Sequence, residues 1–322
     1  MSKELNSQKK YTDRGYAAAF GSALFLSLSA IFIRYLTQNF SIPALILVFW
    51  REIFVAGTLF LILIIINPER LRGTKGYLGQ LLIYGLVLAL FNAFWTFSVN
   101  LNGAAVATVL AYSSAGFTAL LGWLIQKEKL TIIKILVVIL SLIGCALVVN
   151  AFDPKLWGLN NESAVVGVAT GLLYAIYTIM GRSAAQRGLN TWTTLFYIFA
   201  FASLFMLSFN LLLGGIIPGT AAEPVDLLWL GNAWLGWVML IALAIGPTLM
   251  GFGLYNVSLR YLPSSTANLV VMVEPIFTTI VAFFMFGEIL TLVQILGAGL
   301  ILVSVGLMRI KSSKDLEIKR ES

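Results

Sequence analysis

The sequence predicts an all-α membrane protein of ten transmembrane helices, arranged as two five-helix repeats of opposite orientation. Three observations predict this class: an apolar composition, ten long apolar stretches and an internal repeat. Of the 322 residues, 59% are hydrophobic and 11% are charged, whereas soluble domains carry roughly 25% charged residues. A soluble fold of this size needs polar side chains to cover its surface, so the composition predicts a bilayer environment.

Each apolar stretch is long enough to cross the hydrocarbon core as a helix, which takes roughly 20 residues. The runs are continuous rather than short and alternating, which excludes the strands of a membrane barrel. The first run directly follows a polar, basic segment and is too long for the core of a signal peptide, so we interpret it as a span. The predicted spans are 15–37, 43–66, 77–99, 103–126, 131–149, 163–181, 191–213, 234–259, 264–286 and 291–309.

Lysine and arginine residues fall mostly on one side of these spans. With the N-terminus in the cytoplasm, 18 of the 21 lie on the inner side, Arg34 and Lys155 lie outside, and Arg51 lies within the second span. Cytoplasmic loops are enriched in Lys and Arg, so both termini are predicted to face the cytoplasm, in the inner (plasma) membrane. The net charge of +7 therefore reflects topology, and nucleic acid is not an expected partner.

An internal repeat relates the two halves of the chain. Residues 98–147 and 258–307 align without a gap at an offset of 160 residues, and both contain Glu-x-Leu-Thr between two spans, at Glu128 and Glu288. Chance similarity between apolar helices is the alternative, and the shared motif argues against it. The first copy reads KEKLT and the second GEILT; loss of the lysines is expected where the turn is external. The halves are therefore predicted to be inverted, as in many secondary transporters, whose substrate site lies near the midplane.

The repeat also predicts the organisation of the chain. The connection between the seventh and eighth spans, residues 214–233, is rich in Gly and Pro and leads to Trp229, Trp234 and Trp237. These tryptophans are typical of an interfacial aromatic belt, and a lid over the transport path is the alternative. The expected segments are a cytoplasmic tail 1–14, a first repeat 15–150, an external linker 151–162, a second repeat 163–309 and a cytoplasmic tail 310–322.

Two segments resemble a known family. The stretch VVMVEPIFTTIVAFFMFGEILTLVQILGAGLILVSVGL, residues 270–307, resembles the signature of the drug/metabolite transporter superfamily, specifically its EamA-type ten-helix exporters. FWRE at 49–52 resembles the Trp/Arg position of that family. The resemblance implies a pore between the halves, with the fifth and tenth helices peripheral. It also implies export of amino acids or related metabolites, with drugs as the alternative substrate class.

Three charged residues stand out within predicted spans, where a charge costs roughly 3 kcal/mol on insertion scales. Glu274 lies ten residues into the ninth span, about 15 Å deep at ~1.5 Å per residue. We expect it to contact a substrate ammonium or carry a proton, or to be an inert hydrogen-bonded carboxyl. Pro275 should kink the same helix. Arg51 either pairs structurally with a carboxylate or carbonyls, or binds a substrate carboxylate, and it lies about 100° around the helix from Glu52.

Uncharged polar and aromatic residues within the spans either line a cavity or join helices by hydrogen bonds. Tyr174 and Tyr177 share a helix face at i, i+3 spacing, which favours a common role. Where the second half has Glu274-Pro275, the first has Ser114-Ala115, so one half alone would supply a midplane carboxylate. The candidate substrate-binding residues are Glu274, Arg51, Trp95, Asn92, Tyr112, Tyr174, Tyr177, Asn256 and Asn268, with Ser113 and Ser114 as weaker neighbours.

Other conspicuous residues receive structural interpretations. Glu128 and Glu288 are expected to cap helix ends, and Cys145 is expected to be a packing residue. Small residues in membrane helices allow close packing, which is the expected role of three glycines of the last span, Gly297, Gly299 and Gly306.

Several function classes are excluded by what the sequence lacks. It has no histidine and one cysteine, which excludes a disulfide framework and a Cys/His metal cluster, and we expect no metal or cofactor. An intramembrane enzyme would need clustered histidines, paired aspartates or a Ser/Lys dyad at depth, and none is apparent, so no catalytic residue is assigned. One membrane-embedded cation argues against phosphorylated substrates. We expect a carrier of small molecules, facilitative or proton-coupled, acting as a monomer or homodimer. A channel or non-transporting scaffold is the alternative.

Overall fold

A computed structural model describes residues 2–72, 75–151, 161–286 and 291–321. Every regular element within these ranges is helical, which confirms the predicted all-α class. Most of the predicted linker 151–162, together with Lys155 and Glu288, lies outside the described residues.

The helices of the two halves follow the predicted spans, with one exception. α4 (Leu78–Tyr112) continues without interruption from the third predicted span, 77–99, into the fourth, 103–126, so the predicted connection between them is wrong. In the first half the helices are α1 (Ser2–Phe40), α2 (Ala44–Ile66), α3 (Glu69–Arg72), η1 (Lys75–Tyr77), α4 (Leu78–Tyr112), α5 (Ser114–Gln126) and α6 (Ile132–Val148). In the second half they are α7 (Asn161–Gln186), α8 (Thr191–Leu212), η3 (Pro224–Leu228), α9 (Trp234–Leu243), η4 (Ala244–Met250), α10 (Gly251–Tyr261), α11 (Ser264–Val271), α12 (Glu274–Phe286) and α13 (Leu292–Glu321).

Length and hydropathy identify the membrane spans among these helices. Nine segments of the described residues are long and apolar enough to cross a bilayer, and α6 adds a shorter apolar helix of 17 residues. Together they account for the ten predicted spans. Large apolar side chains face outward, such as Ile65, Leu212 and Phe284, which are 80%, 77% and 78% exposed. An apolar exterior of this extent fits a lipid-facing surface. The chain is a multi-pass membrane protein.

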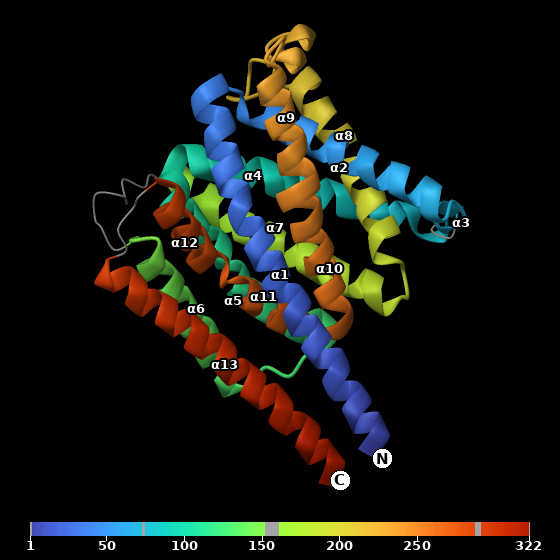
Figure 1. Cartoon of the computed structure of the whole chain (residues 1–322), viewed down its shortest axis with the longest axis vertical. Helices are drawn as coiled ribbons and strands as arrows, with labels where there is room; N and C mark the ends of the chain where they lie inside the picture. The colour runs from blue at the N-terminus through green and yellow to red at the C-terminus, as the bar shows by residue number, and fades with distance from the viewer. Residues whose placement is uncertain (1, 73–74, 152–160, 287–290, 322) are drawn as a thin grey trace.

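Helices of the two halves are interleaved rather than separate. α4 packs along α7, α1 along α10, and α2 along α8. Glycines allow the closest approach between α4 and α7: a Cβ added at Gly171 would lie 2.9 Å from the Leu110 carbonyl oxygen, and one at Gly181 would lie 2.7 Å from the Tyr84 hydroxyl. The N- and C-terminal ends of the chain lie near one another at one end of the molecule (Figure 1). We call this the termini end.

The fifth and tenth spans, α6 and α13, run side by side along one edge of the molecule (Figure 1). Gly144 and Gly297 bring their backbones together, since a Cβ at Gly297 would lie 2.7 Å from the Gly144 carbonyl oxygen. Nothing lies within 4 Å of such an atom at Gly299 or Gly306. Close packing is therefore confirmed for Gly297. For Gly299 and Gly306 the prediction is wrong among the described residues, because no neighbouring atom there is close enough to need a glycine.

The connection 214–233 lies against the ends of α1 and α2. The Trp50 indole donates to the Leu227 carbonyl at 2.6 Å, and the Leu45 amide at the start of α2 donates to the Gly219 carbonyl at 2.9 Å. Trp229 and Trp234 are 45% and 72% exposed. Their exposure suits an aromatic belt, while the contacts of the connection with α2 suit a lid, so both interpretations remain.

Candidate functional site

The fourth and ninth spans are each interrupted, at equivalent positions of the repeat. α4 ends at Tyr112 and α5 begins at Ser114, while α11 ends at Val271 and α12 begins at Glu274. The Ser113 carbonyl accepts from the amides three and four residues later, at 3.0 and 3.2 Å, and the Val273 carbonyl does the same at 3.0 and 3.4 Å. The offset of 160 residues relates Ser113 to Val273. The backbone therefore repeats the same break in both halves.

The two breaks meet through a hydrogen bond. The Tyr112 hydroxyl, at the end of α4, donates to the Glu274 carboxylate at 2.7 Å. Glu274 is the first residue of α12, where the partial positive charge of the helix N-terminus favours a carboxylate. Pro275 lies in the first helical turn, where its missing N–H costs no hydrogen bond. The predicted kink is thus a short turn at Met272 and Val273, placed just before Glu274.

A network of tyrosines and asparagines lies beside these breaks. Asn256 of α10 donates to the Tyr177 hydroxyl at 2.7 Å and accepts from the Tyr84 hydroxyl at 3.1 Å. The rings of Tyr174 and Tyr177 lie 6.3 Å apart, and Tyr174 lies 5.7 Å from Tyr255. The network therefore joins α4 of the first half to α7 and α10 of the second.

Tyr255 connects this network to α11 and to the first break. Asn268 donates to the Tyr255 hydroxyl at 3.4 Å and accepts from the Ser114 hydroxyl at 3.4 Å. Thr178 and Tyr255 share a shorter hydrogen bond of 2.7 Å. Tyr112, Tyr174, Tyr177, Asn256 and Asn268 thus lie in one region, and their role in substrate binding stays a prediction. Tyr84, Thr178 and Tyr255 were missed, although a polar residue beside Asn256 in an apolar span is a signal for Tyr255.

The second span contributes a separate polar group. Asn92 of α4 donates to the Glu52 carboxylate at 2.7 Å, and both residues are buried. Arg51 is 5% exposed, and its Nε and Nη2 atoms have no hydrogen-bond partner among the described residues. The second oxygen of Glu52 is equally unpartnered there. Buried polar atoms are normally hydrogen-bonded, so this group retains capacity for both an acceptor and a donor from a ligand.

Asn92 links this group to the aromatic network by sequence, because its neighbour Phe91 stacks on Tyr174 with ring centroids 5.0 Å apart. Trp95 lies one turn further along α4 and is half-buried. In the part of the chain that the structure describes, no hydrogen bond joins Arg51 or Trp95 to the network. Their roles stay predictions.

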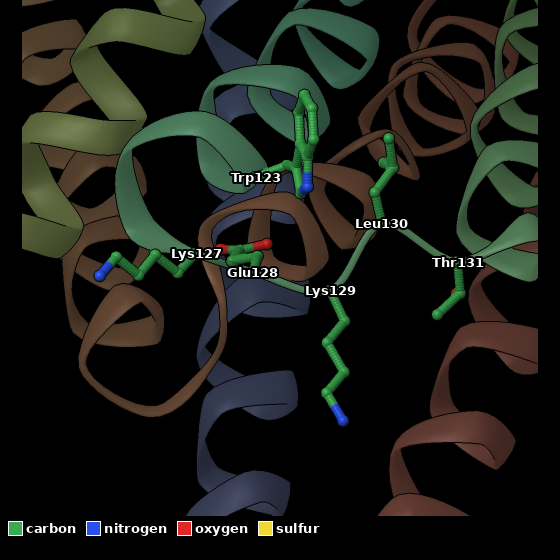
Figure 2. Close-up of a pocket in the computed structure, with 6 residues that line it drawn as sticks. All are labelled: Trp123, Lys127, Glu128, Lys129, Leu130 and Thr131. Atoms are coloured by element: carbon green, nitrogen blue, oxygen red, sulfur yellow. The ribbon is translucent and has the colours of Figure 1, made fainter.

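An open pocket of about 510 Å³ lies elsewhere, at the turn between α5 and α6. Figure 2 shows Lys127 and Lys129 extending away from one another, while the Glu128 carboxylate turns back toward the bundle. Glu128 accepts from the Ser264 amide at 2.7 Å and pairs with Lys134 at 3.0 Å. The expected capping role holds in an unexpected form, because Glu128 caps α11 of the other half.

The described residues contain no group of three or more potential metal ligands. Cys145 is buried, as expected for a packing residue. The arrangement is therefore one of hydrogen-bonding groups and aromatic rings around two helix breaks.

Comparison with known proteins identifies the family. The model of the EamA-like transporter family matches residues 13–150 and 162–310. An uncharacterized transporter of Archaeoglobus fulgidus is 26% identical over 224 residues, which cover 68% of this chain and 74% of that protein. The threonine/homoserine exporter RhtA of Escherichia coli K12 is 23% identical over 270 residues, covering 83% of this chain and 80% of RhtA.

A solved crystal structure shares the fold, with a TM-score of 0.74 at 15% identity, covering 93% of this chain and 98% of the other. The family model matches twice and spans nearly the whole sequence, which confirms the predicted resemblance. The chain belongs to the EamA-like transporter family, within the drug/metabolite transporter superfamily.

Proposed function

We propose that this protein is a secondary transporter that exports small organic solutes, amino acids or related metabolites, by alternating access. The observation that carries the proposal is the meeting of two repeat-related helix breaks through Tyr112 and Glu274. Broken helices near the midplane expose backbone groups and helix ends, from which secondary transporters build their substrate sites. Such a site suits a carrier better than an enzyme.

The topology proposed for the carrier is two inverted five-helix repeats, 15–150 and 163–309, joined by an external linker 151–162. The tails 1–14 and 310–322 then lie in the cytoplasm and the carrier in the inner membrane. The two family matches, the bias of Lys and Arg, and the common end of both termini support this arrangement. The termini end is then the cytoplasmic end.

An amino acid is the substrate class that the polar residues favour. Glu274 supplies a negative charge for an ammonium group, and Arg51 has free donors for a carboxylate. Asn92 donates to Glu52, the neighbour of Arg51, and Asn268 accepts from Ser114 beside the first break, so each polar group includes an amide side chain. The similarity to a threonine/homoserine exporter supports the same class. A drug-sized apolar substrate is the alternative, favoured by the rings of Tyr174 and Trp95 beside the network.

Proton coupling is a further part of the proposal. Glu274 is half-buried and is linked to the opposite half by its hydrogen bond to Tyr112. A carboxylate in that position can exchange a substrate ammonium for a proton, which would couple the two fluxes. No histidine is present to serve instead.

The test is counterflow in proteoliposomes with radiolabelled threonine. Preloaded unlabelled threonine should accelerate uptake of the labelled compound, with saturation, and an imposed proton gradient should change the rate. Flux without trans-stimulation would indicate a channel and contradict the carrier proposal. Acceleration by a lipophilic cation, with none by threonine, homoserine or other amino acids, would favour the multidrug alternative.

A further inference from the structure

The turn between α5 and α6 contains a buried carboxylate that the proposed substrate site does not use. The side chains of Glu128 and Lys134 are 10% and 7% exposed. They are buried although they lie in or just after the KEKLT turn, at the end of a membrane span. Glu128 and its neighbour Gln126 belong to the first half, yet their hydrogen-bond partners lie largely in the second.

Four hydrogen bonds cross between the halves at this place. The Glu128 carboxylate accepts from the Ser264 amide at 2.7 Å and from the Ser265 hydroxyl. Gln126 accepts from the Ser264 hydroxyl at 2.7 Å and donates to the Ile179 carbonyl at 3.0 Å. We call Gln126, Glu128, Lys134, Ser264 and Ser265 the Glu128 cluster.

The backbone is shaped to admit this carboxylate. Lys127 adopts a left-handed conformation (φ 55°) that ends α5 and turns the chain. A Cβ added at Gly122 would lie 3.0 Å from the carboxyl carbon of Glu128, so glycine leaves the space that the carboxylate occupies. Lys127 and Lys129 on either side point away from the bundle (Figure 2). Of the three charged residues in KEKLT that precede leucine, the glutamate alone turns inward.

The sequence does not repeat this cluster in the other half. At the offset of 160 residues, Ser264 and Ser265 correspond to Ala104 and Ala105. Likewise Gln126 corresponds to Phe286, and Lys134 to Gln294. The glutamate is shared, as Glu288, but its polar partners are not. Inverted repeats place equivalent positions at opposite ends of the molecule. The Glu128 cluster lies at the termini end, where Lys311 of α13 contacts Thr131 beside it, and the equivalent sequence of the other half lacks its two serines, its glutamine and its lysine.

The contacts of the Glu128 cluster also differ in kind from the packing of α4 against α7. α4 and α7 approach through glycines against backbone and ring atoms, a packing that cannot separate without opening voids. The Glu128 cluster is polar and lies at a helix end, where water can replace each hydrogen bond when the helices part. It is therefore suited to repeated opening and closing.

We infer that Glu128 is the residue that holds the transport path closed at the termini end, by binding the N-terminus of α11, and that the carrier opens there when these bonds break. The inference rests on the proposed alternating access. It assigns to Glu128 a role in the conformational equilibrium of the carrier rather than in substrate binding. A ligand or mutation shifts such an equilibrium only by interacting differently with its two states.

The experiment measures access to a cysteine behind the closure, independently of any substrate. Ala267 is fully buried on α11, one turn beyond Ser264, and Ala267→Cys in a Cys145→Ser background provides a single thiol. A charged, membrane-impermeant methanethiosulfonate reagent is applied to inverted vesicles and to intact cells. With Glu128→Ala, labelling from the cytoplasmic face should accelerate roughly tenfold or more, the effect expected for losing a hydrogen bond to a charged group.

Glu69→Gln is the matched control, since Glu69 is an exposed glutamate on α3, and it should leave the labelling rate unchanged. If the cysteine variant does not fold, deuterium uptake by residues 258–272 replaces it, and should rise in Glu128→Ala only. Equal labelling and equal uptake in folded Glu128→Ala would overturn the inference. Faster labelling in a protein that shows counterflow of none of the amino acids or the lipophilic cation would leave the closure standing and overturn the transport proposal instead.

Discussion

The two helix breaks have the same backbone and different chemistry. Ser113 and Val273 accept from equivalent amides at nearly equal distances, yet Ser114 follows the first break where Glu274 follows the second. The first break contributes a hydroxyl donor, Tyr112, and the second the carboxylate that receives it. A duplicated backbone thus needs its ionisable group in one copy only, because the breaks meet and share it.

The surroundings of the breaks differ as well. At the first, Gly171 of α7 lies so close that an added Cβ would collide with the Ser113 hydroxyl oxygen. At the second, Glu274 is half-buried and accepts a hydrogen bond from Tyr112. The first break is held by packing and the second by a polar contact, so substitutions at the two should have separable effects.

The largest effect is expected at the residues that distinguish the breaks. Glu274→Ala should reduce threonine flux by about 10- to 100-fold, the range for losing a hydrogen bond to a charged group. Ser114→Ala, at the equivalent position, should change flux by less than about threefold, because its hydrogen bond to Asn268 is long, at 3.4 Å. Initial rates of efflux from preloaded proteoliposomes measure both.

Glu274→Gln separates substrate binding from proton coupling at the same position. It keeps an acceptor for Tyr112 and removes the titratable group, so residual flux should no longer respond to an imposed pH gradient. Unchanged gradient dependence in Glu274→Gln would show that the proton, if one is moved, travels elsewhere. Equal losses in Glu274→Ala and Ser114→Ala would contradict the distinction between the breaks.

An intermediate effect is expected from the packing around the first break. Gly171→Ala should lower stability in detergent by about 1–3 kcal/mol, the usual cost of overpacking, because the methyl group meets Ser113 and Leu110. Gly116→Ala is the matched control within the same break, since nothing lies within 4 Å of an added Cβ there. Thermal unfolding in detergent compares the two. A Gly171→Ala protein as stable as Gly116→Ala would show that packing does not hold this break.

The spans could be predicted from sequence because bilayer thickness imposes a length that local hydropathy reveals. The breaks could not, because residues 103–126 are long enough for one span and a pair of serines such as Ser113 and Ser114 can also lie within a continuous membrane helix. Pro275 predicts a kink in the ninth span, whereas the fourth span contains no proline that would predict one. Pro247 lies within the π-helical segment η4, a distortion that the apolar pattern of the eighth span does not reveal.

The site was predicted in part, for a related reason. Polar residues in apolar spans identify candidates such as Asn256 and Asn268, and these do lie in one network. Pairing across helices depends on how the helices pack, which no local pattern contains. The hydrogen bonds from Asn92 to Glu52 and from Ser264 to Glu128 therefore cannot be predicted from the sequence. For the same reason the sequence predicts that Glu128 caps its own helix.

The smallest effect on stability and transport is expected for a substitution at Pro275, although a proline within a membrane span is usually thought to shape the helix. The first half breaks at Ser113 with Ala115 in the equivalent position, so a proline is not required to interrupt the span. Pro275 lies in the first turn of α12, where alanine can adopt the same conformation and regain an N–H. Pro275→Ala should therefore cost less than about 1 kcal/mol, the scale of the backbone entropy it restores to the unfolded chain. The threonine flux and melting temperature of Pro275→Ala, measured beside those of Glu274→Ala, test this prediction. If Pro275→Ala lost as much transport as Glu274→Ala, the proline would be what interrupts the ninth span, and packing would account for the break in the fourth span only.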